Sequence, residues 1–291
     1  MMKLFSIKEV EDYTGIKAAT VRMWERRYGV CIPERKSGGS RQYKLAELDM
    51  LLNIALLNKN GFKISKLANL SPQTLLDKVA SLAHIEDRRQ HAINRLIFYK
   101  FSTDVDAFES HLDECFKTFG IEDTLNDIIV PFLKTVNILY YSSTTNEVHL
   151  AVTLIRRKLI YYIESLAPLK SLNKTALLFL PQGEHYDLML LYMQYMVKSA
   201  GLKPIYLGTN IAQQNIKLIV NQKKPDYLFT YLIPKSTFGM ADVLAYLKET
   251  SPQQVVIIVA EDVPAHGTDE NIKYIHFRHF RDVLQSTVEG D

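Results

Sequence analysis

The sequence has little that would cross-link it or anchor it in a membrane. It contains two cysteines, Cys31 and Cys115, far apart and outside any CxxC or Cys/His cluster, so neither a disulfide framework nor a structural zinc site is indicated. It has no charged-then-apolar N-terminal pattern, and no apolar run approaches the roughly 20 residues that span a bilayer. We therefore expect a cytoplasmic protein with ordinary thiols and no membrane partner.

Motifs of catalysis are missing as well. No P-loop, GxSxG, HExxH or paired-carboxylate pattern occurs. His276 and His279 have the spacing of a metal pair, but no third ligand is evident, so surface histidines are favoured. We expect no enzyme activity and no metal. The 291 residues, 47% of them hydrophobic, suffice for two or three globular units.

Positive charge is concentrated at one end of the chain. Residues 1–70 carry 13 Lys and Arg against 7 Asp and Glu, whereas residues 71–291 carry 22 against 25. Phosphate binding by one module would require such a basic segment, because Lys and Arg supply most non-specific DNA affinity through counterion release. Basic faces are common, so the asymmetry alone decides nothing.

Two short helices are predicted at the start of this basic segment. Ser6 can cap a helix from Ile7 to about Tyr13, with Glu9 as the capping-box partner. A glycine-containing break precedes a second helix over 17–27, which has apolar positions on one side and Thr20 and arginines around its surface. This pattern is typical of a helix-turn-helix.

A turn and further helices complete the segment. The paired glycines Gly38 and Gly39 stand between basic and aromatic residues and indicate a tight β-turn, a plausible wing. An amphipathic helix from Leu45, ended by Gly61, and a short helix over 65–69 follow.

Residues 5–30 and 33–43 resemble the DNA-binding domain of the MerR family in its "VRxWERRYG" branch; they read FSIKEVEDYTGIKAATVRMWERRYGV and PERKSGGSRQY. The resemblance implies that the second helix enters the major groove, that the wing grips the backbone, and that two heads bind a pseudo-palindromic operator. Carried over by position, the groove residues would be Thr20, Arg22 and Trp24, and the phosphate contacts Arg27, Lys36, Arg41 and Tyr43.

The middle of the chain is predicted to be a helical bundle over 75–170, after a boundary at Pro72 that closes a domain over 1–72. Apolar residues recur at helical spacing in 75–84, 88–100, 105–119, 121–141 and 146–166.

The tail, 173–291, alternates apolar runs with helical stretches. Strands are predicted over 176–180, 205–207, 227–232 and 255–260, and helices near 186–200, 212–222 and 239–249. This repetition implies a doubly wound parallel sheet, flavodoxin- or Rossmann-like. Ligands bind such sheets at the carboxyl ends of the strands, so we expect the pocket rim at 181–186, 208–211, 233–236 and 261–266.

The order of helix-turn-helix, bundle and α/β domain, together with HLAVTLIRRKL and PQGEHYDLMLLYMQYMVKSAGLKPIYLG, resembles the light- and cobalamin-responsive repressors of the CarH/LitR type. In that family a bundle tryptophan and a Glu-His pair cover adenosylcobalamin, and the histidine of an E-x-H-x-x-G motif ligates cobalt.

Position by position, the cobalamin motif is degenerate. Glu184 holds the acidic place, but Tyr186 replaces the ligating histidine and Met189 the glycine; His185 lies one residue off, about 100° around a helix. Ile138 falls on the tryptophan, and Val148 with His149 on the Glu-His pair. Thr230 and Leu232 match a Ser-x-Leu motif, whereas Glu261 stands where glycine permits close approach.

We therefore predict a MerR-type regulator, with two alternatives. In the first reading, cobalamin is not bound and control comes from another small molecule, from a partner protein, or from neither; a homo-oligomer, at least a dimer on DNA, is expected. The alternatives are an adenosylcobalamin photoreceptor-repressor that uses His185 or His149, and a corrinoid-carrier or methyltransferase-like enzyme subunit.

Overall fold

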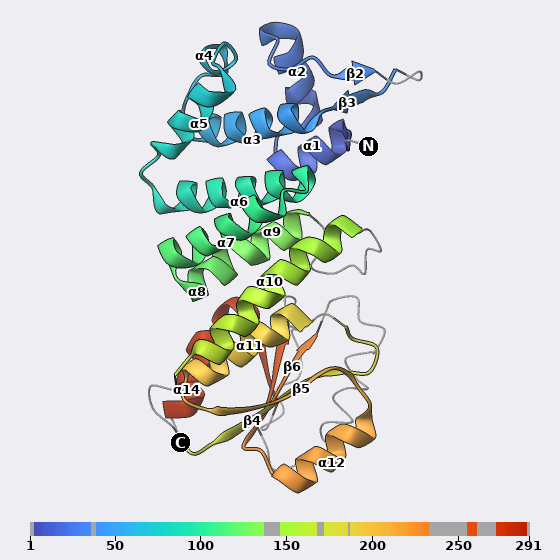
Figure 1. Ribbon diagram of the computed structural model, residues 1–291, viewed down its shortest axis with the longest axis vertical. Coiled ribbons are helices and arrows are strands. Elements are labelled where there is room, and N and C mark those ends of the chain that lie inside the picture. Colours follow the sequence, from blue (N-terminus) through green and yellow to red (C-terminus); the bar gives the residue numbers. More distant parts are fainter. Residues whose placement is uncertain are drawn as a thin grey trace. The chain divides into compact units, whose positions relative to one another are not determined.

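The computed structural model describes residues 3–35, 39–136, 146–167, 172–185, 187–232, 255–260 and 272–289. The chain divides into two compact units, Met1–Ala151 and Val152–Asp291. Figure 1 shows a helical unit and a unit built on a parallel sheet. Within the described ranges, every helix is too short or too polar to cross a membrane.

The first unit begins with a winged helix-turn-helix. Its antiparallel sheet has the order β1-β3-β2, with Phe5 opposite Tyr43 and Glu34 opposite Gln42. The elements are β1 (Phe5–Ser6), α1 (Ile7–Thr14), α2 (Ala18–Tyr28), β2 (Glu34–Arg35), β3 (Arg41–Tyr43), α3 (Leu45–Lys59) and α4 (Ile64–Leu67).

The predicted capping box at the start of α1 is present. The Ser6 hydroxyl accepts the Glu9 N–H at 3.2 Å, and the Glu9 carboxylate accepts the Ser6 N–H at 2.8 Å. Gly15 ends the helix with a φ of 70°, a left-handed conformation that favours glycine. Local sequence therefore specifies where this helix begins and ends.

The next helices after the winged domain are α5 (Pro72–Ala80), α6 (Ile85–Ser102), α7 (Val105–Phe119), α8 (Ile121–Asp123), η1 (Thr124–Ile129) and α9 (Val130–Thr135). Of these, α5 and α6 pack against α3 of the winged domain, and the others pack against α6 or against one another. Pro72 is the first residue of α5, where a missing N–H costs nothing, and Ser71 caps that helix. The structure thus places a helix start, inside one compact unit, where the sequence suggested a domain boundary.

One predicted helix, over 121–141, is not a continuous α-helix. It widens into the π-helix η1 directly before Pro131, which lacks the N–H that would bond the carbonyl four residues earlier. The buried Thr124 hydroxyl donates to the Cys115 carbonyl at 2.9 Å and ties this segment to α7. Residues 137–141 lie outside the described ranges.

The second unit is a five-stranded parallel sheet of order β5-β4-β6-β7-β8. This is the flavodoxin-like order, so the predicted doubly wound fold is confirmed. The strands and helices are β4 (Thr175–Pro181), α11 (Asp187–Ser199), β5 (Lys203–Ile211), α12 (Gln213–Lys223), β6 (Tyr227–Leu232), β7 (Val255–Ala260), β8 (Ile272–His276), η2 (Phe277–His279) and α14 (Phe280–Glu289); α10 (Asn146–Ser165) spans the division between the units.

Helices cover both faces of this sheet (Figure 1). On one face α12 packs through Ile216 and Val220 against Leu177, Phe179 and Leu228. On the other face Phe280 of α14 contacts Phe229 edge-on, at a centroid distance of 5.6 Å. Burial of alternate strand residues under both layers stabilises the sheet.

Two features of this unit were not predicted. The strand β8 and the helix α14 follow the last predicted strand. The segment 208–211, expected as a rim loop, is the end of β5, whose pairing with β4 is irregular after Leu178 and again after Phe179. The predicted helix near 239–249 lies outside the described residues.

Candidate functional site

The helix α2 presents its cationic side chains to solvent. Val21 and Trp24 are buried, whereas Arg22, Arg26 and Arg27 are exposed and Thr20 is half-buried. Arg27 also lies over the Tyr28 ring, 5.7 Å from its centroid. Since the buried residues fix one side of the helix, the arginines line the side that a duplex could approach.

The start of α2 is held by a carboxylate from α1. Lys17 precedes the helix and makes no side-chain cap. Glu11 accepts the Ala18 N–H instead, at 3.1 Å, and its other oxygen lies 3.5 Å from the Lys17 ammonium. This contact satisfies an otherwise unpaired helix donor and sets the angle between the two helices.

Trp24 does not lie where the resemblance places it. Its exposed fraction is 5%, and it belongs to the core of the winged domain. An indole buried this far has its surface covered by protein rather than by base edges. The expected groove position of Trp24 is therefore corrected to a core position.

Glu25 joins α2 to the hairpin formed by β2 and β3. Its carboxylate accepts a hydrogen bond from Arg41 Nε at 2.8 Å and another from the Tyr43 hydroxyl. Burial first, and then this bond, raise the pKa of Tyr43, and the bond to Glu25 raises the pKa of Arg41. The hairpin is thus fixed on α2 by a side-chain network rather than by packing alone.

This network also corrects Tyr43, which was expected at a phosphate. The Tyr43 side chain is fully buried, with its hydroxyl engaged by Glu25, so it positions the hairpin instead of touching a ligand. Arg41 remains partly exposed. Lys36, at the turn, lies outside the described residues.

Sequence reasoning missed Glu25. The signal was one acidic residue inside MWERRY, on a helix otherwise expected to carry positive charge. An acid there costs affinity for phosphate unless a cation neutralises it. A search for its partner would have led to the hairpin arginine.

In the α/β unit, β4 and β6 are neighbours at the point where the strand order reverses, which is where such sheets bind ligands. Glu184 follows β4 and is 5% exposed. Thr230 lies near the end of β6; it is fully buried, and its hydroxyl has no hydrogen-bond partner among the described residues. The structure thus brings these two predicted site residues to the two strands that flank the switch point.

The turn after β4 is held by two hydrogen bonds to Asn210 of β5. The Gly183 N–H donates to Asn210 Oδ1 at 2.9 Å, and the Asn210 N–H donates to the Glu184 carbonyl, also at 2.9 Å. Asp187 then starts α11 and makes a two-point pair with Arg156 of α10, with both N···O distances 2.7 Å. These contacts hold Gly183, Glu184 and Asp187, the described neighbours of the place that the resemblance assigns to the cobalt ligand.

The ligand set itself is only partly described. His185 is exposed, and Met189 is buried in α11. His149 and Val148 lie on α10 and Leu232 ends β6, but their side chains are outside the described set. Ile138, Tyr186, Glu261 and the rim segments 233–236 and 261–266 also lie outside it.

The histidine pair near the C-terminus does not form a metal centre in the described residues. The rings of His276 and His279 are 6.0 Å apart. Among the residues that the structure describes, no group of three or more His, Cys, Asp or Glu side chains could hold an ion.

A winged helix-turn-helix with a cationic second helix is an architecture typical of DNA-binding domains, and here it precedes a flavodoxin-like sheet. Comparison with known proteins agrees. Residues 5–74 match the MerR HTH family regulatory protein model. The N-terminal domain is therefore a MerR-type helix-turn-helix.

Two relatives extend the similarity beyond this domain. The chain is 24% identical over 266 residues to the HTH-type transcriptional repressor CarH of Myxococcus xanthus, with 88% of each chain covered. It is 26% identical over 260 residues to the repressor CarA of the same organism, covering 86% of this chain and 85% of CarA. The chain is thus similar to CarH and CarA in both of its parts.

A solved structure supports the fold of the second part. The monomethylamine corrinoid protein of Methanosarcina barkeri has a TM-score of 0.50 to this chain at 13% identity, covering 68% of this chain and 99% of that one. At this identity the likeness concerns the fold alone.

Proposed function

We propose that the chain is a sequence-specific transcriptional regulator that binds a pseudo-palindromic operator as a dimer. The observation that supports this proposal most directly concerns α2. This helix exposes three arginines on the side opposite its buried Val21 and Trp24, namely Arg22, Arg26 and Arg27. Arg22 reads bases in the major groove, and Arg27, Lys36 and Arg41 contact phosphates, which positions the helix without specifying sequence.

Binding to the DNA upstream of the protein's own gene tests this proposal. Fluorescence anisotropy and footprinting should reveal a protected pseudo-palindrome. Arg22→Ala should abolish the preference for this site over random DNA, because a bidentate base contact contributes about 1–3 kcal/mol per head. Lys117→Ala on α7 removes the same charge from an exposed site away from α2 and should leave the preference intact.

Two outcomes would contradict the proposal. Wild-type specificity in Arg22→Ala at physiological salt would show that α2 is not the reading helix. Absence of any protected site would instead favour the enzyme-subunit alternative, in which the N-terminal domain serves only as an interaction module.

We further propose that the α/β domain does not hold cobalamin through a lower axial histidine. Tyr186 occupies the ligating place, and a phenol is a poor substitute for imidazole on cobalt. The neighbouring His185 is exposed, while Asp187, two residues after His185, is paired with Arg156. Movement of His185 into the ligating place would have to break that pair.

One observation favours the alternative of a cobalamin-dependent repressor. Among the described residues the buried Thr230 hydroxyl of β6 has no hydrogen-bond partner, so it leaves a polar group near the switch point that a ligand could satisfy. Adenosylcobalamin added in the dark, followed by gel filtration and a visible spectrum, separates the two readings. We expect no co-eluting corrinoid, and a bound corrinoid would establish the alternative.

A gain-of-ligand variant makes a negative result informative. Tyr186→His combined with Met189→Gly restores the E-x-H-x-x-G pattern on an unchanged sheet. If loss of these residues is the reason for the lost binding, this variant should retain corrinoid where the natural protein does not. Equal behaviour of the two proteins would place the obstacle elsewhere, for example at Glu261.

A further inference from the structure

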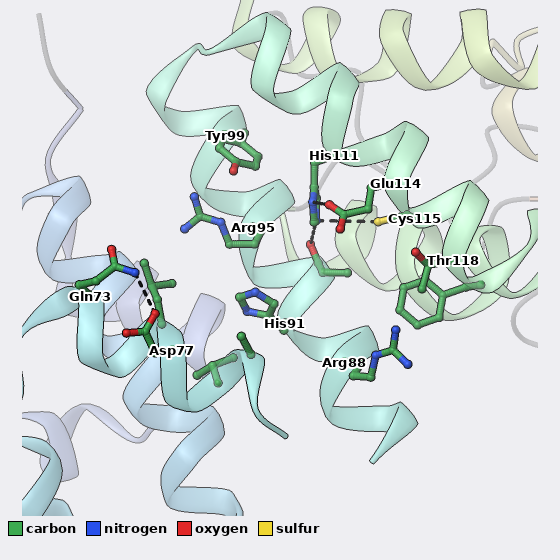
Figure 2. A pocket seen from close by; sticks show the side chains of 15 residues that line it. Gln73, Asp77, Arg88, His91, Arg95, Tyr99, His111, Glu114, Cys115 and Thr118 are labelled. Atoms are coloured by element: carbon green, nitrogen blue, oxygen red, sulfur yellow. Dashed lines mark hydrogen bonds and ion pairs between the residues drawn. The ribbon is translucent and has the colours of Figure 1, made fainter. Parts of the chain in front are cut away.

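The helical part of the first unit contains a cavity that no sequence motif predicted. It has a volume of about 510 Å³ and lies between α5, α6 and α7 (Figure 2). On α6 its lining includes Arg88, His91 and Arg95, which follow one another at helical spacing. Helices that pack tightly face each other with apolar residues, so a polar face turned toward a neighbouring helix requires an explanation.

The inner wall of this cavity carries hydrogen-bond donors, and the acidic groups lie at its rim. Arg95 is 15% exposed in its side chain, and His111 is 13% exposed. Glu114 is 72% exposed, and Asp77 is exposed and bonded to Gln73. Arg88 lies over the Phe119 ring and has no carboxylate partner among the described residues.

His91 carries an unsatisfied polar atom in the lining of this cavity. Its Nδ1 atom is buried and has no hydrogen-bond partner in the described part of the chain. In contrast, the neighbouring His111 ring contacts the Ala92 carbonyl at 3.2 Å and Glu114 at 3.5 Å. An unpaired nitrogen between two guanidinium-bearing residues of the same helix, in a space large enough for a small molecule, points to an absent polar partner.

We propose that this cavity is an effector site for a small organic carboxylate, whose anionic head is held by Arg95, His91 and Arg88. The apolar body of the ligand would lie against Leu76, Val79 and Ala92, which line the same space. Guanidinium groups suit a planar carboxylate because they offer paired donors.

Arg95 connects this site to the DNA-binding domain. Its Nη1 atom lies 3.3 Å from Asp49 of α3, the helix that follows the wing. One position earlier, Asn94 donates to the Leu52 carbonyl of α3 at 3.3 Å. A carboxylate in the cavity competes with Asp49 for the Arg95 guanidinium and so alters the contact between α6 and α3. The effect on DNA rests on the proposed function, whereas ligand binding does not.

The first experiment measures binding to the full-length chain without DNA. The probes are benzoate and hexanoate, with benzamide and hexanamide as neutral controls and inorganic phosphate as a bare anion. We expect both carboxylates to shift the His91 ring nitrogens in ¹H–¹⁵N spectra, saturably and in the millimolar range, while the amides and phosphate do not. His84, exposed at the start of α6, should not respond.

Variants locate the site. Saturation transfer from the protein to benzoate, observed on the benzoate signals, should be lost in His91→Leu and Arg88→Gln and kept in the matched control His84→Leu. His91→Leu should also raise the Tm, because it removes an unpaired buried nitrogen, which a merely structural histidine would not do. The proposal is overturned if neither carboxylate binds, if the amides or phosphate act equally, or if both cavity variants bind normally.

The second experiment adds benzoate to the protein on its operator and follows anisotropy. A several-fold change in affinity that disappears in Arg95→Gln supports the effector role, and unchanged affinity despite demonstrated binding refutes it. If the protein binds no operator at all while the His91 signal responds, the proposed function fails and the ligand site stands. If it binds the operator but none of the probes, the ligand site fails and the proposed function stands.

Discussion

The DNA-binding end and the α/β end of this chain differ in what holds their functional segments in place. In the winged domain the carboxylates of Glu11 and Glu25 orient the recognition helix and its hairpin. In the α/β domain the sheet is held by strand pairing and apolar burial, and no side-chain hydrogen bond of Glu184 or Thr230 contributes to it among the described residues. Site residues can therefore change in the second domain while the fold persists, whereas in the first the scaffold and the site share residues.

The largest expected effect tests whether Trp24 supports the fold or reads DNA. Trp24→Ala should lower the free energy of unfolding by about 3–5 kcal/mol, because it opens a cavity in the core. Trp24→Phe should cost less and keep the preference for the operator. Urea unfolding and anisotropy measure the two quantities. If a stably folded Trp24→Phe protein no longer discriminates between bases, Trp24 contacts DNA in the groove and our placement of it in the core is wrong.

The next effect concerns pH. Burial first, then Arg95 and His111, lower the pKa of His91 from 6.5 to about 4. Between pH 6.5 and pH 4 the unfolded chain therefore binds a proton at His91 and the folded chain does not. The contribution to the free energy of unfolding is fully present above about pH 6.5 and is lost toward pH 4, by up to about 3 kcal/mol.

Replacement of His91 isolates this contribution from that of the carboxylates. In His91→Leu the loss of stability between pH 6.5 and 4 should be smaller than in the natural protein, as measured by urea unfolding across that range. His84→Leu, on the exposed start of the same helix, should follow the natural protein. Parallel curves for all three proteins would mean that His91 titrates normally.

A smaller loss is expected at the hairpin anchor. Glu25→Gln keeps the shape of the side chain but removes the charge that Arg41 and Tyr43 share, at a cost of about 2 kcal/mol. Operator affinity should fall more than this stability loss explains, because the hairpin is no longer fixed on α2. Glu34→Gln, on the exposed strand of the same hairpin, is the matched control. Equal affinity of the two variants would contradict an anchoring role.

The smallest effect lies in the α/β domain. Arg156→Gln breaks the pair with Asp187, which is partly exposed, and should cost about 1 kcal/mol or less. DNA binding should be unchanged, so this variant marks the difference between the two ends. Denaturant unfolding and operator titration on the same sample provide the measurement. A loss of operator affinity in Arg156→Gln would show that a contact in the α/β domain affects DNA binding by the winged domain.

Local signals in the sequence predict the elements well. The Ser6–Glu9 capping box predicted the start of α1, and apolar runs predicted β6 and β7 at their observed bounds. The strand β8 escaped because IKYIH is short and mixes charged and apolar residues. The π-helix escaped because periodicity cannot show how a helix accommodates Pro131.

The candidate sites were harder to predict because they depend on pairs far apart in sequence. Glu25 and Tyr43 are 18 residues apart, and nothing in either segment names the other as its partner. Arg95 and Asp49 are separated by 46 residues. A resemblance to a family predicts which segment such residues belong to. Only the burial of the side chain distinguishes an anchor such as Tyr43 from a residue that contacts DNA.

The irregular pairing of β5 has a further consequence. Within the described residues β5 is an edge strand, and an exposed flat edge invites another chain to add to the sheet. Gly208, with a φ of 92°, and Asn210, with a φ of 56°, interrupt this edge where its register against β4 shifts. The bent edge offers a poor template for strand addition, so the chain can assemble through chosen surfaces without polymerising through its sheet.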